Sequence, residues 1–462
     1  MTEAALLPRT EVPPGEPGRI ALLADGLDAF ASRVAAARGA QHTLDLQYYI
    51  WQGDLTGRLL AREALKAADR GVRVRILMDD MFALNRTYGL TALNGHPMVQ
   101  MRRFNATRWR RWGRWGLLLE IAFGNWHLNR RMHNKAWIAD GRVVICGGRN
   151  IGNRYFDASD DFNFRDLDVV AESHAAADAA AVFEAFWASP LSQPIEALRI
   201  RSGPRRLRRL RRRLERLSVT REAKIFLDAP DRAGRRMLDI DPDAIEILAD
   251  PPDKAAGLAG SAVAPVLEEL FAAARREVLL ISPYFVPGQA AATQLMGLVG
   301  AGVRVAVITN SLAATDVIAV HGGYARYRAR LIAAGVEVYE LKHSAEGSAG
   351  VFGSRGASLH TKAVVVDGRA VFVGSFNLDP RSANLNTEMG VLTRQPALAR
   401  LARRHFARLA TGARSWRVRL AGRRLVWDDG TSAADAGSEP GATRFRRAVA
   451  LLVRVLPVES QL

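Results

Sequence analysis

Residues 131–150 read RMHNKAWIADGRVVICGGRN, and residues 359–377 read LHTKAVVVDGRAVFVGSFN. Each stretch carries a histidine, a lysine two positions later, and an Asp-Gly pair between two apolar runs. Asp-Gly in that setting is a strong hairpin signal. Each stretch therefore predicts two antiparallel strands joined at Asp140 or Asp367. Two such patterns in matching places indicate an internal repeat.

The segments that precede these stretches repeat one order of elements. They read as strand, helix and strand twice, over residues 44–51, 55–71 and 72–80, and again over residues 277–288, 290–302 and 303–311. The strands are rich in β-branched residues, and the helices have apolar residues at i, i+3 and i+4. Such βαβ units predict a parallel or mixed sheet, and hence two similar α/β domains.

The repeat divides the chain into five parts. We predict a flexible tail over residues 1–19, a first domain over 20–200, a basic linker over 201–240, a second domain over 241–410 and a basic extension over 411–462. The tail is rich in Pro, Glu and Gly, which favours disorder.

The linker has the pattern of a basic amphipathic helix. Leucines recur at spacings of three, four and three among arginines, at Leu207, Leu210, Leu214 and Leu217. A narrow leucine stripe of this kind suits a contact between domains. The arginines around it also suit an anionic membrane interface, which is the interpretation we favour.

Composition restricts the class of protein. With 462 residues and 48% hydrophobic content, the chain can bury one large core and more readily two. The single cysteine, Cys146, lies in an apolar run and predicts a buried thiol, not a disulfide framework. The net charge of +18 implies an anionic partner: a phospholipid surface, a nucleic acid or a phosphorylated substrate.

The sequence carries neither an export leader nor an apolar run of about 18 residues. We therefore expect the protein on the cytoplasmic side of the cell membrane, attached peripherally.

The paired histidines and lysines are the candidate catalytic groups. Because residues two apart on a strand share a face, His133 with Lys135, and His360 with Lys362, can each present an imidazole and an ammonium to one phosphate. The lysine supplies charge, and the histidine can attack phosphorus or move a proton. The sequence has no Cys/His metal cluster and no nucleotide-binding or serine-hydrolase motif. We predict a mechanism without a metal or a cofactor.

Four carboxylates complete the candidate set. Asp140 and Asp367 belong to the repeated pattern and count as candidate catalytic residues, although their turn positions make direct substrate contact an unfavoured interpretation. Asp168 and Glu388 lie downstream, before short apolar stretches. We expect this second pair to orient the imidazoles.

The repeated pattern H-x-K-x4-D, followed by G-[S/G]-x-N, resembles the defining motif of the phospholipase D superfamily. The resemblance implies two α/β/α sandwich domains whose motifs meet in one active site at their interface. It also implies a phosphohistidine intermediate, and by analogy we assign His133 as the nucleophile and His360 as the acid and base.

The resemblance further implies which residues contact the phosphate. The lysines would act with Asn150 and Asn377 to hold phosphoryl oxygens in place. A serine usually follows the first glycine of G-[S/G]-x-N. Ser375 keeps it in the second copy, whereas Gly148 replaces it in the first, so a hydroxyl contact to phosphate is expected only from the second half.

Further segments, including PYFVPG at 283–288 and GVEVYELK at 335–342, resemble the bacterial cardiolipin synthases within that superfamily. This implies transfer of a phosphatidyl group to phosphatidylglycerol, which forms cardiolipin, with phosphatidylethanolamine as a further candidate substrate. Two alternatives stay open. One is a phosphodiesterase that hydrolyses phospholipid or, less favoured, nucleic acid; the other is a lipid-binding protein without catalysis. The sequence leaves the participation of an accessory protein open.

Two basic segments are candidates for membrane contact. Residues 108–133 mix arginines with Trp109, Trp112, Trp115 and Trp126, a composition that suits the lipid headgroup region. Residues 444–462 form a second basic amphipathic pattern. For each segment the alternative is a helix packed on the protein core, and nucleic-acid binding is a third interpretation of the first.

Overall fold

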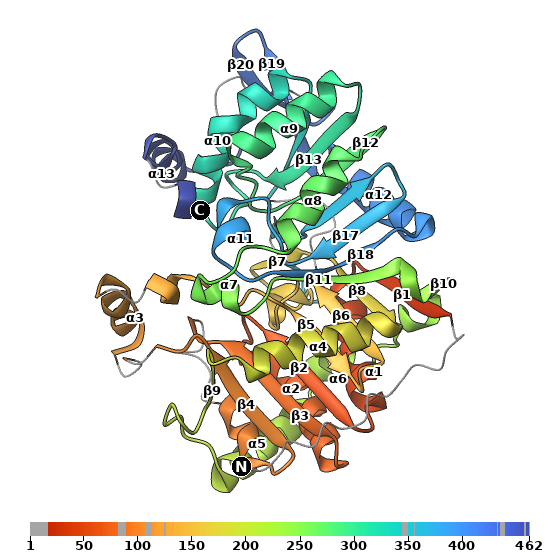
Figure 1. Cartoon of the computed structure of the whole chain (residues 1–462), viewed down its shortest axis with the longest axis vertical. Coiled ribbons are helices and arrows are strands. Elements are labelled where there is room, and N and C mark those ends of the chain that lie inside the picture. Colours follow the sequence, from red (N-terminus) through yellow and green to blue (C-terminus); the bar gives the residue numbers. More distant parts are fainter. Residues whose placement is uncertain are drawn as a thin grey trace.

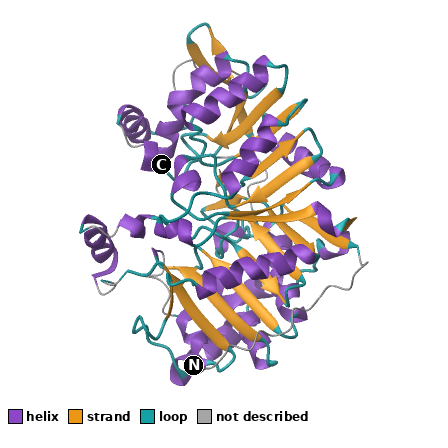
Figure 2. Cartoon of the chain, in the orientation of Figure 1, coloured by secondary structure: helices purple, strands orange, loops and turns teal. Residues whose placement is uncertain are grey.

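A computed structural model describes residues 17–81, 89–107, 109, 112–123, 126–343, 350–354, 356–431, 433–434, 439–456 and 459–461. The chain forms two similar halves stacked along the long axis of the molecule (Figure 1). Each half has a mixed β-sheet with helices on both faces (Figure 2). The predicted α/β class and the pair of α/β/α sandwiches are confirmed.

Nine strands among the described residues form the sheet of the first half. In spatial order they are β10 (Leu238–Ile240), β1 (Gly18–Leu23), β8 (Asp168–Glu172), β6 (Val143–Gly147), β5 (Ala136–Ala139), β2 (Thr43–Tyr48), β3 (Arg73–Asp79), β4 (Val99–Phe104) and β9 (Ser192–Pro194). Strand β1 begins inside the segment that the sequence predicts to be a tail, and residues 1–16 of that segment lie outside the described residues.

The sheet of the second half contains ten strands among the residues that the structure describes. In spatial order they are β11 (Ile245–Ala249), β18 (Met389–Thr393), β17 (Ala370–Gly374), β16 (Ala363–Val366), β12 (Glu277–Ile281), β13 (Arg304–Asn310), β14 (Glu337–Leu341), β19 (Ser415–Ala421), β20 (Arg424–Asp428) and β21 (Ala433–Ala434).

The two sheets share a central arrangement. Strands β2, β3 and β4 are parallel, as are β12, β13 and β14, and each set is flanked by an antiparallel hairpin, β5–β6 or β16–β17. The hairpin turns are those predicted from Asp-Gly. Asp140 and Gly141 have φ of 54° and 61°, and Asp367 and Gly368 have φ of 54° and 64°. Positive φ at both central positions matches the twist of the flanking strands.

Helices pack on both faces of each sheet, while α3 and α13 stand to one side (Figure 1). The α-helices among the described residues are α1 (Gly26–Gly39), α2 (Leu55–Asp69), α3 (Gly113–Ala122), α4 (His174–Ala188), α5 (Pro204–Ser218), α6 (Arg221–Leu227), α7 (Asp253–Ala256), α8 (Val263–Ala272), α9 (Gly288–Gly300), α10 (Ile318–Ala333), α11 (Pro380–Asn384), α12 (Pro396–Leu409) and α13 (Arg444–Val455).

One hydrophobic core is shared by the two halves. Helix α4 contributes Phe183 and Phe186 to it, and α12 contributes Leu398 and Phe406, all of them at most 3% exposed. Helix α4 contacts β11 of the second half, and α12 contacts β1 of the first. Burial of these apolar side chains stabilises the position of one half relative to the other.

The predicted basic linker packs against the first half. Leu207, Leu210 and Leu214 of α5 are buried in the core that α1 and α2 also line, and Leu217 is partly buried against it. The leucine stripe is therefore an internal contact, as in the packing alternative. The stripe packs against α2 and the 3₁₀ helix Leu90–Gly95, so it does not require a lipid surface. The membrane interpretation concerned the arginines around the stripe and stays a prediction.

The predicted C-terminal extension adds to the second half. Strands β19 to β21 lengthen the sheet, and α13 packs on α10. The guanidinium of Arg326 on α10 donates to the carbonyls of Val453 and Arg454, at 3.0 and 2.7 Å. Among the helices described, none has both the length and the apolar character needed to cross a bilayer.

Candidate active site

A parallel strand pair between the halves creates the first part of the site. Strand β7 (Phe162–Arg165) comes from the first half and pairs with β15 (Gly356–Leu359) of the second, with Arg165 opposite Leu359. The next residue of each strand is therefore placed beside the other. These residues are Asp166 and His360, and Nδ1 of His360 lies 2.6 Å from Oδ2 of Asp166.

The same arrangement recurs with the halves exchanged. Met132 and Thr387 form a parallel bridge, and the backbone N–H of His133 donates to the carbonyl of Thr387 at 2.9 Å. His133 and Glu388 follow these two residues, and Nδ1 of His133 lies 2.8 Å from Oε2 of Glu388. Each histidine is thus held by a carboxylate of the opposite half.

Glu388 contacts an imidazole as the sequence led us to expect, whereas Asp168 does not. The Asp168 carboxylate is fully buried, forms an ion pair with Arg33 at 2.8 Å and accepts the backbone N–H of Arg149 at 3.1 Å. Our expectation for Asp168 is wrong, and Asp166 takes the position against the second imidazole.

Strand register explains the error. Gly147 faces Asp168 across β6 and β8, and the equivalent Gly374 faces Gly390 across β17 and β18. Asp168 therefore corresponds to Gly390, and the counterpart of Glu388 lies two residues before Asp168. Counting back from the glycine of G-[S/G]-x-N across the adjoining strand is the signal that would have identified Asp166.

Asp140 and Asp367 support the fold instead of contacting the imidazoles. Each lies at the far end of its strand from the histidine. The Asp140 carboxylate accepts the backbone N–H groups of Gln41, His42 and Thr43, at 2.8 to 2.9 Å, and Asp367 accepts those of residues 275–277. The candidate catalytic assignment of these two residues is therefore corrected: each fixes the chain entering the central parallel strand.

The histidine–lysine pairs lie just before β5 and β16. We predicted them within strands, and the structure places them immediately before the strands begin. The ammonium of Lys135 donates to the carbonyl of His133, and that of Lys362 donates to the carbonyl of His360. Both lysines are 1% exposed. An ammonium and an imidazole are thus adjacent in each half, as expected for groups that share one phosphate.

Aromatic rings enclose both imidazoles. The ring of Tyr49 lies edge-on to His133, with centroids 5.1 Å apart. Tyr155 and Phe164 approach His360 at 5.3 and 4.9 Å. His133 and His360 are only 8% and 6% exposed, so little water reaches them.

This burial sets the protonation of the site. Desolvation lowers the pKa of His133 to about 4, against the opposing effect of Glu388, and lowers the pKa of His360 well below its usual value. It also lowers the pKa of Lys135 to about 7 and that of Lys362 to about 8. In the free protein the imidazoles are neutral near pH 7. A neutral imidazole that donates Nδ1–H to a carboxylate keeps its Nε2 lone pair available.

The predicted phosphate-binding residues lie beside these groups. Asn150 accepts the N–H of Ile50 at 3.0 Å and donates to the Tyr155 hydroxyl at 3.2 Å. The Oδ1 atom of Asn377 is buried and makes no hydrogen bond within the described part of the chain.

The difference between Gly148 and Ser375 follows from the carboxylates. The Ser375 hydroxyl donates to Glu388 and accepts the N–H of Met389 at 3.0 Å. A Cβ atom at Gly148 would lie only 2.1 Å from Oδ1 of Asp166. The shorter aspartate therefore occupies the space in the first half that a serine side chain takes in the second.

Comparison with known proteins agrees with this geometry. The family model described as "Cardiolipin synthase, PLD-like domain" matches residues 34–187 and 267–410, which include both histidine–lysine pairs. The chain belongs to this phospholipase D-like family. It is accordingly an enzyme of the phospholipase D superfamily, of the phosphatidyltransferase type.

Individual relatives extend the similarity beyond the motifs. The chain is 38% identical to cardiolipin synthase C of Escherichia coli (strain K12), over 99% of this chain and 98% of that protein. It is 25% identical to a cardiolipin synthase of Geobacillus kaustophilus, over 80% of this chain and 61% of that one. Phosphatidylserine synthase of Haemophilus influenzae Rd KW20 has the same fold, with a TM-score of 0.60 at 14% identity over 87% of this chain and 89% of that one.

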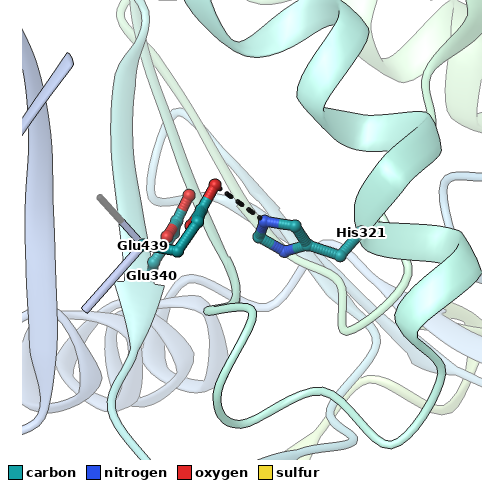
Figure 3. Close-up of side chains that lie close together, drawn as sticks. All are labelled: His321, Glu340 and Glu439. Carbon is teal, nitrogen blue, oxygen red and sulfur yellow. Dashed lines mark ion pairs between the residues drawn. The ribbon is translucent and has the colours of Figure 1, made fainter. Parts of the chain in front are cut away.

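Beyond the phospholipase D-like motifs, one further group of described residues has metal-ligand chemistry. Ligand atoms of His321, Glu340 and Glu439 lie within 4.8 Å of one another (Figure 3). However, Arg328 donates to both carboxylates, at 2.7 Å each, and Trp427 also donates to Glu340. The arginine already supplies the positive charge that a metal ion would bring, so we interpret the group as an internal ion-pair network that ties Glu439 to α10 and β14.

Two exposed apolar helix faces lie on the same side of the phospholipase D-like enzyme, those of α3 and α13 (Figure 1). Near α3, Trp115 and Phe123 are each 75% exposed, and on α13 Phe445 and Val455 are 72% and 73% exposed. The segments that follow these helices are in contact, because Asn129 in the 3₁₀ helix Trp126–Asn129 donates to Gln461 near the C-terminus at 2.9 Å. Residues 108, 110 and 111 and the side chain of Trp126, which belong to the predicted tryptophan segment, lie outside the described residues.

Proposed function

We propose that this enzyme transfers a phosphatidyl group through a phosphohistidine intermediate to the hydroxyl of phosphatidylglycerol, forming cardiolipin. The crossed pairing of two neutral imidazoles with carboxylates, next to two lysines, carries this proposal. Similarity to cardiolipin synthase C over nearly the whole chain supports the choice of product.

In the proposed first step, Nε2 of His133 attacks phosphorus and a P–N bond forms. The P–O bond to the leaving alcohol breaks, and protonated His360 gives its proton to that oxygen. In the second step, His360 takes the proton of the acceptor hydroxyl, whose oxygen attacks phosphorus while the P–N bond breaks. Both imidazoles return to their starting states, and the positive charge that develops on His133 is balanced by Glu388.

Substrate binding supplies the protonated His360 that this sequence needs. In the free enzyme, burial and the two lysine charges keep the pKa of His360 low. A phosphodiester adds negative charge between the lysines, and an opposite charge at close range favours the protonated form of an imidazole. The acid is therefore charged only when the group to be transferred is in place.

Restricted water access supports transfer over hydrolysis. The imidazoles are at most 8% exposed and are walled by aromatic rings. Water and the lipid hydroxyl compete for the same intermediate, so a site that admits little water favours the lipid.

We further propose that the enzyme binds the cytoplasmic side of the cell membrane through α3 and α13. Exposed tryptophan and phenylalanine in the α3 region, and apolar side chains beside arginines on α13, suit the headgroup region of an anionic bilayer. Phosphatidylglycerol would be drawn from that bilayer, with phosphatidylethanolamine as a candidate donor.

Lipid mass spectrometry tests the proposed reaction. Purified protein would be incubated with phosphatidylglycerol vesicles, with and without phosphatidylethanolamine, and we expect cardiolipin. His133→Ala and His360→Ala should abolish it, while His174→Ala, which alters an exposed histidine on α4, should not. Cardiolipin production that survives either of the first two substitutions contradicts the mechanism. Cleavage of single-stranded DNA without any lipid product would favour the nuclease alternative.

Vesicle flotation tests the membrane contact. Trp115→Ser with Phe445→Ser should reduce the bound fraction on phosphatidylglycerol vesicles. Val219→Ser removes a comparably exposed apolar side chain, 69% exposed, from the end of α5 and should leave binding unchanged. Equal losses from both changes would argue against a specific membrane face.

A further inference from the structure

A cavity outside the histidine site lies between α2 and α5. Its volume is about 520 Å³, within the roughly 300–1,000 Å³ typical of small-molecule sites. Its walls are largely apolar and include Trp51, Ala61, Leu90, Leu210 and Leu214. The histidines, lysines and carboxylates of the active site do not line it. The leucine stripe of α5 thus packs on the first half and also lines part of this cavity.

Three arginines line the same cavity. They are Arg58 of α2 and Arg213 and Arg216 of α5. None of the three guanidinium groups has an ion pair or hydrogen bond with another described residue. Arg211, two positions before Arg213, differs because it pairs with Asp69 at 2.6 Å. The cavity therefore combines an apolar interior with three positive charges that the described part of the protein leaves uncompensated.

This combination selects for one kind of ligand. Free phosphate would satisfy the arginines but leave the apolar walls without contacts. A neutral hydrocarbon would fill the walls but leave the charges unpaired. An amphiphile with an acyl chain and an anionic phosphate satisfies both.

We propose that this cavity binds an anionic phospholipid, with one acyl chain between α2 and α5 and the headgroup phosphate at Arg58, Arg213 and Arg216. The site lies close to the catalytic centre but is distinct from it. The N–H of Gln52, at the cavity wall, donates to the carbonyl of Ile151 at 2.9 Å, and Ile50 donates to Asn150 at 3.0 Å. The proposal does not rest on cardiolipin formation, because it concerns binding alone.

Photo-crosslinking tests the proposal on the full chain. The probe is phosphatidylglycerol with a photoreactive group in one acyl chain, and labelled peptides are mapped by mass spectrometry. We expect label on α2 and on the second half of α5, in the wild-type protein and equally in His133→Ala. That second condition separates this site from the catalytic one. The failure of cardiolipin synthesis in the assay above would not alter this result.

Matched variants decide the role of the arginines and of the cavity itself. Arg213→Glu with Arg216→Glu should reduce labelling of α2 and α5 about tenfold or more, because each loses a charge-assisted contact. Arg208→Glu with Arg212→Glu makes the same change in charge on exposed residues of α5 that do not line the cavity, and should preserve labelling. Leu214→Trp fills the cavity without changing charge and should also reduce labelling.

Three labelling results, and a fourth from competition, would overturn the proposal. The first is label that is absent from α2 and α5 in the wild-type protein. The second is an equal loss in the Arg208/Arg212 variant, which would indicate a general electrostatic effect. The third is equal labelling by a zwitterionic phosphatidylcholine probe. Competition by inorganic phosphate distinguishes the sources of the anion: we expect it to leave labelling intact, and displacement by phosphate alone would identify a free-anion site instead.

Discussion

Asp166 and Asp168 are two residues apart and both are buried, yet their carboxylates have different partners. Asp166 holds the imidazole of His360 at 2.6 Å, whereas Asp168 pairs with Arg33 at 2.8 Å. Changing each aspartate to asparagine keeps its size, removes its charge and replaces one acceptor oxygen with an NH2 donor. The two substitutions should therefore separate a catalytic effect from a structural one.

The expected magnitudes follow from these contacts. Asp166→Asn replaces a charge-assisted hydrogen bond to His360 with a neutral one. A hydrogen bond to a charged group contributes about 1.5–3 kcal/mol, so kcat should fall about 10- to 100-fold while the fold is retained. Asp168→Asn leaves the guanidinium of Arg33, which is 1% exposed, without a charged partner. Breaking such a buried pair costs about 3–5 kcal/mol of folding stability.

The assay combines single-turnover transfer kinetics with denaturant unfolding of the same preparations. Asp166→Asn should have lowered kcat, an altered pH profile and a nearly unchanged unfolding midpoint. Asp168→Asn should unfold at lower denaturant concentration, with kcat close to wild type for the fraction that remains folded. The reasoning is refuted if Asp168→Asn has the catalytic defect at normal stability while Asp166→Asn retains full activity.

Three further outcomes are expected. Lys135 has its pKa lowered by burial to about 7, so its charge is present below that pH and lost above it, and kcat/KM should decline as pH rises through about 7. In Lys135→Arg, which stays charged, the decline should move to about 8, where Lys362 titrates; an unmoved pH profile would contradict this. Gly148→Ser restores the residue usual at that position but should lower kcat about tenfold by displacing Asp166 from His360, as steady-state kinetics will show. Asp140→Ala removes three hydrogen bonds at the start of β2 and should cost about 1–3 kcal/mol in unfolding free energy, with kcat unchanged; a lowered kcat at normal stability would restore the catalytic assignment.

The sequence was sufficient for the fold class and for the central residues of the site. Asp-Gly turns and β-branched runs are local signals, and they predict hairpins wherever they occur, so both motif hairpins were predictable. The internal repeat then indicated two similar sheets. The sequence also predicted that Glu388 orients an imidazole, although it did not indicate that this imidazole is His133 of the other half.

The contact of His360 with Asp166 needed information that is not local. Two aspartates flank Leu167, and only the register of β6 against β8 determines which one occupies the position of Glu388. Strand register depends on pairing between segments, which the spacing of residues along one segment does not specify. The packing of the α5 leucines on the protein was one of two interpretations of the sequence, which could not choose between them for a similar reason. A leucine stripe among arginines looks the same in a sequence whether a lipid surface or another helix covers it.

The crossed carboxylates also show why the two halves must act as one unit. Each histidine takes its orienting partner from the other half, at 2.6 and 2.8 Å, and a hydrogen bond of that length weakens steeply with small displacements. The parallel pair β7–β15 and the core around α4 and α12 fix the distance between the halves. Within a half, the histidine and the lysine are only two residues apart in the sequence, so local fluctuations change their relative position little. Catalysis therefore depends on the packing between the halves, because that packing alone brings each imidazole to its carboxylate.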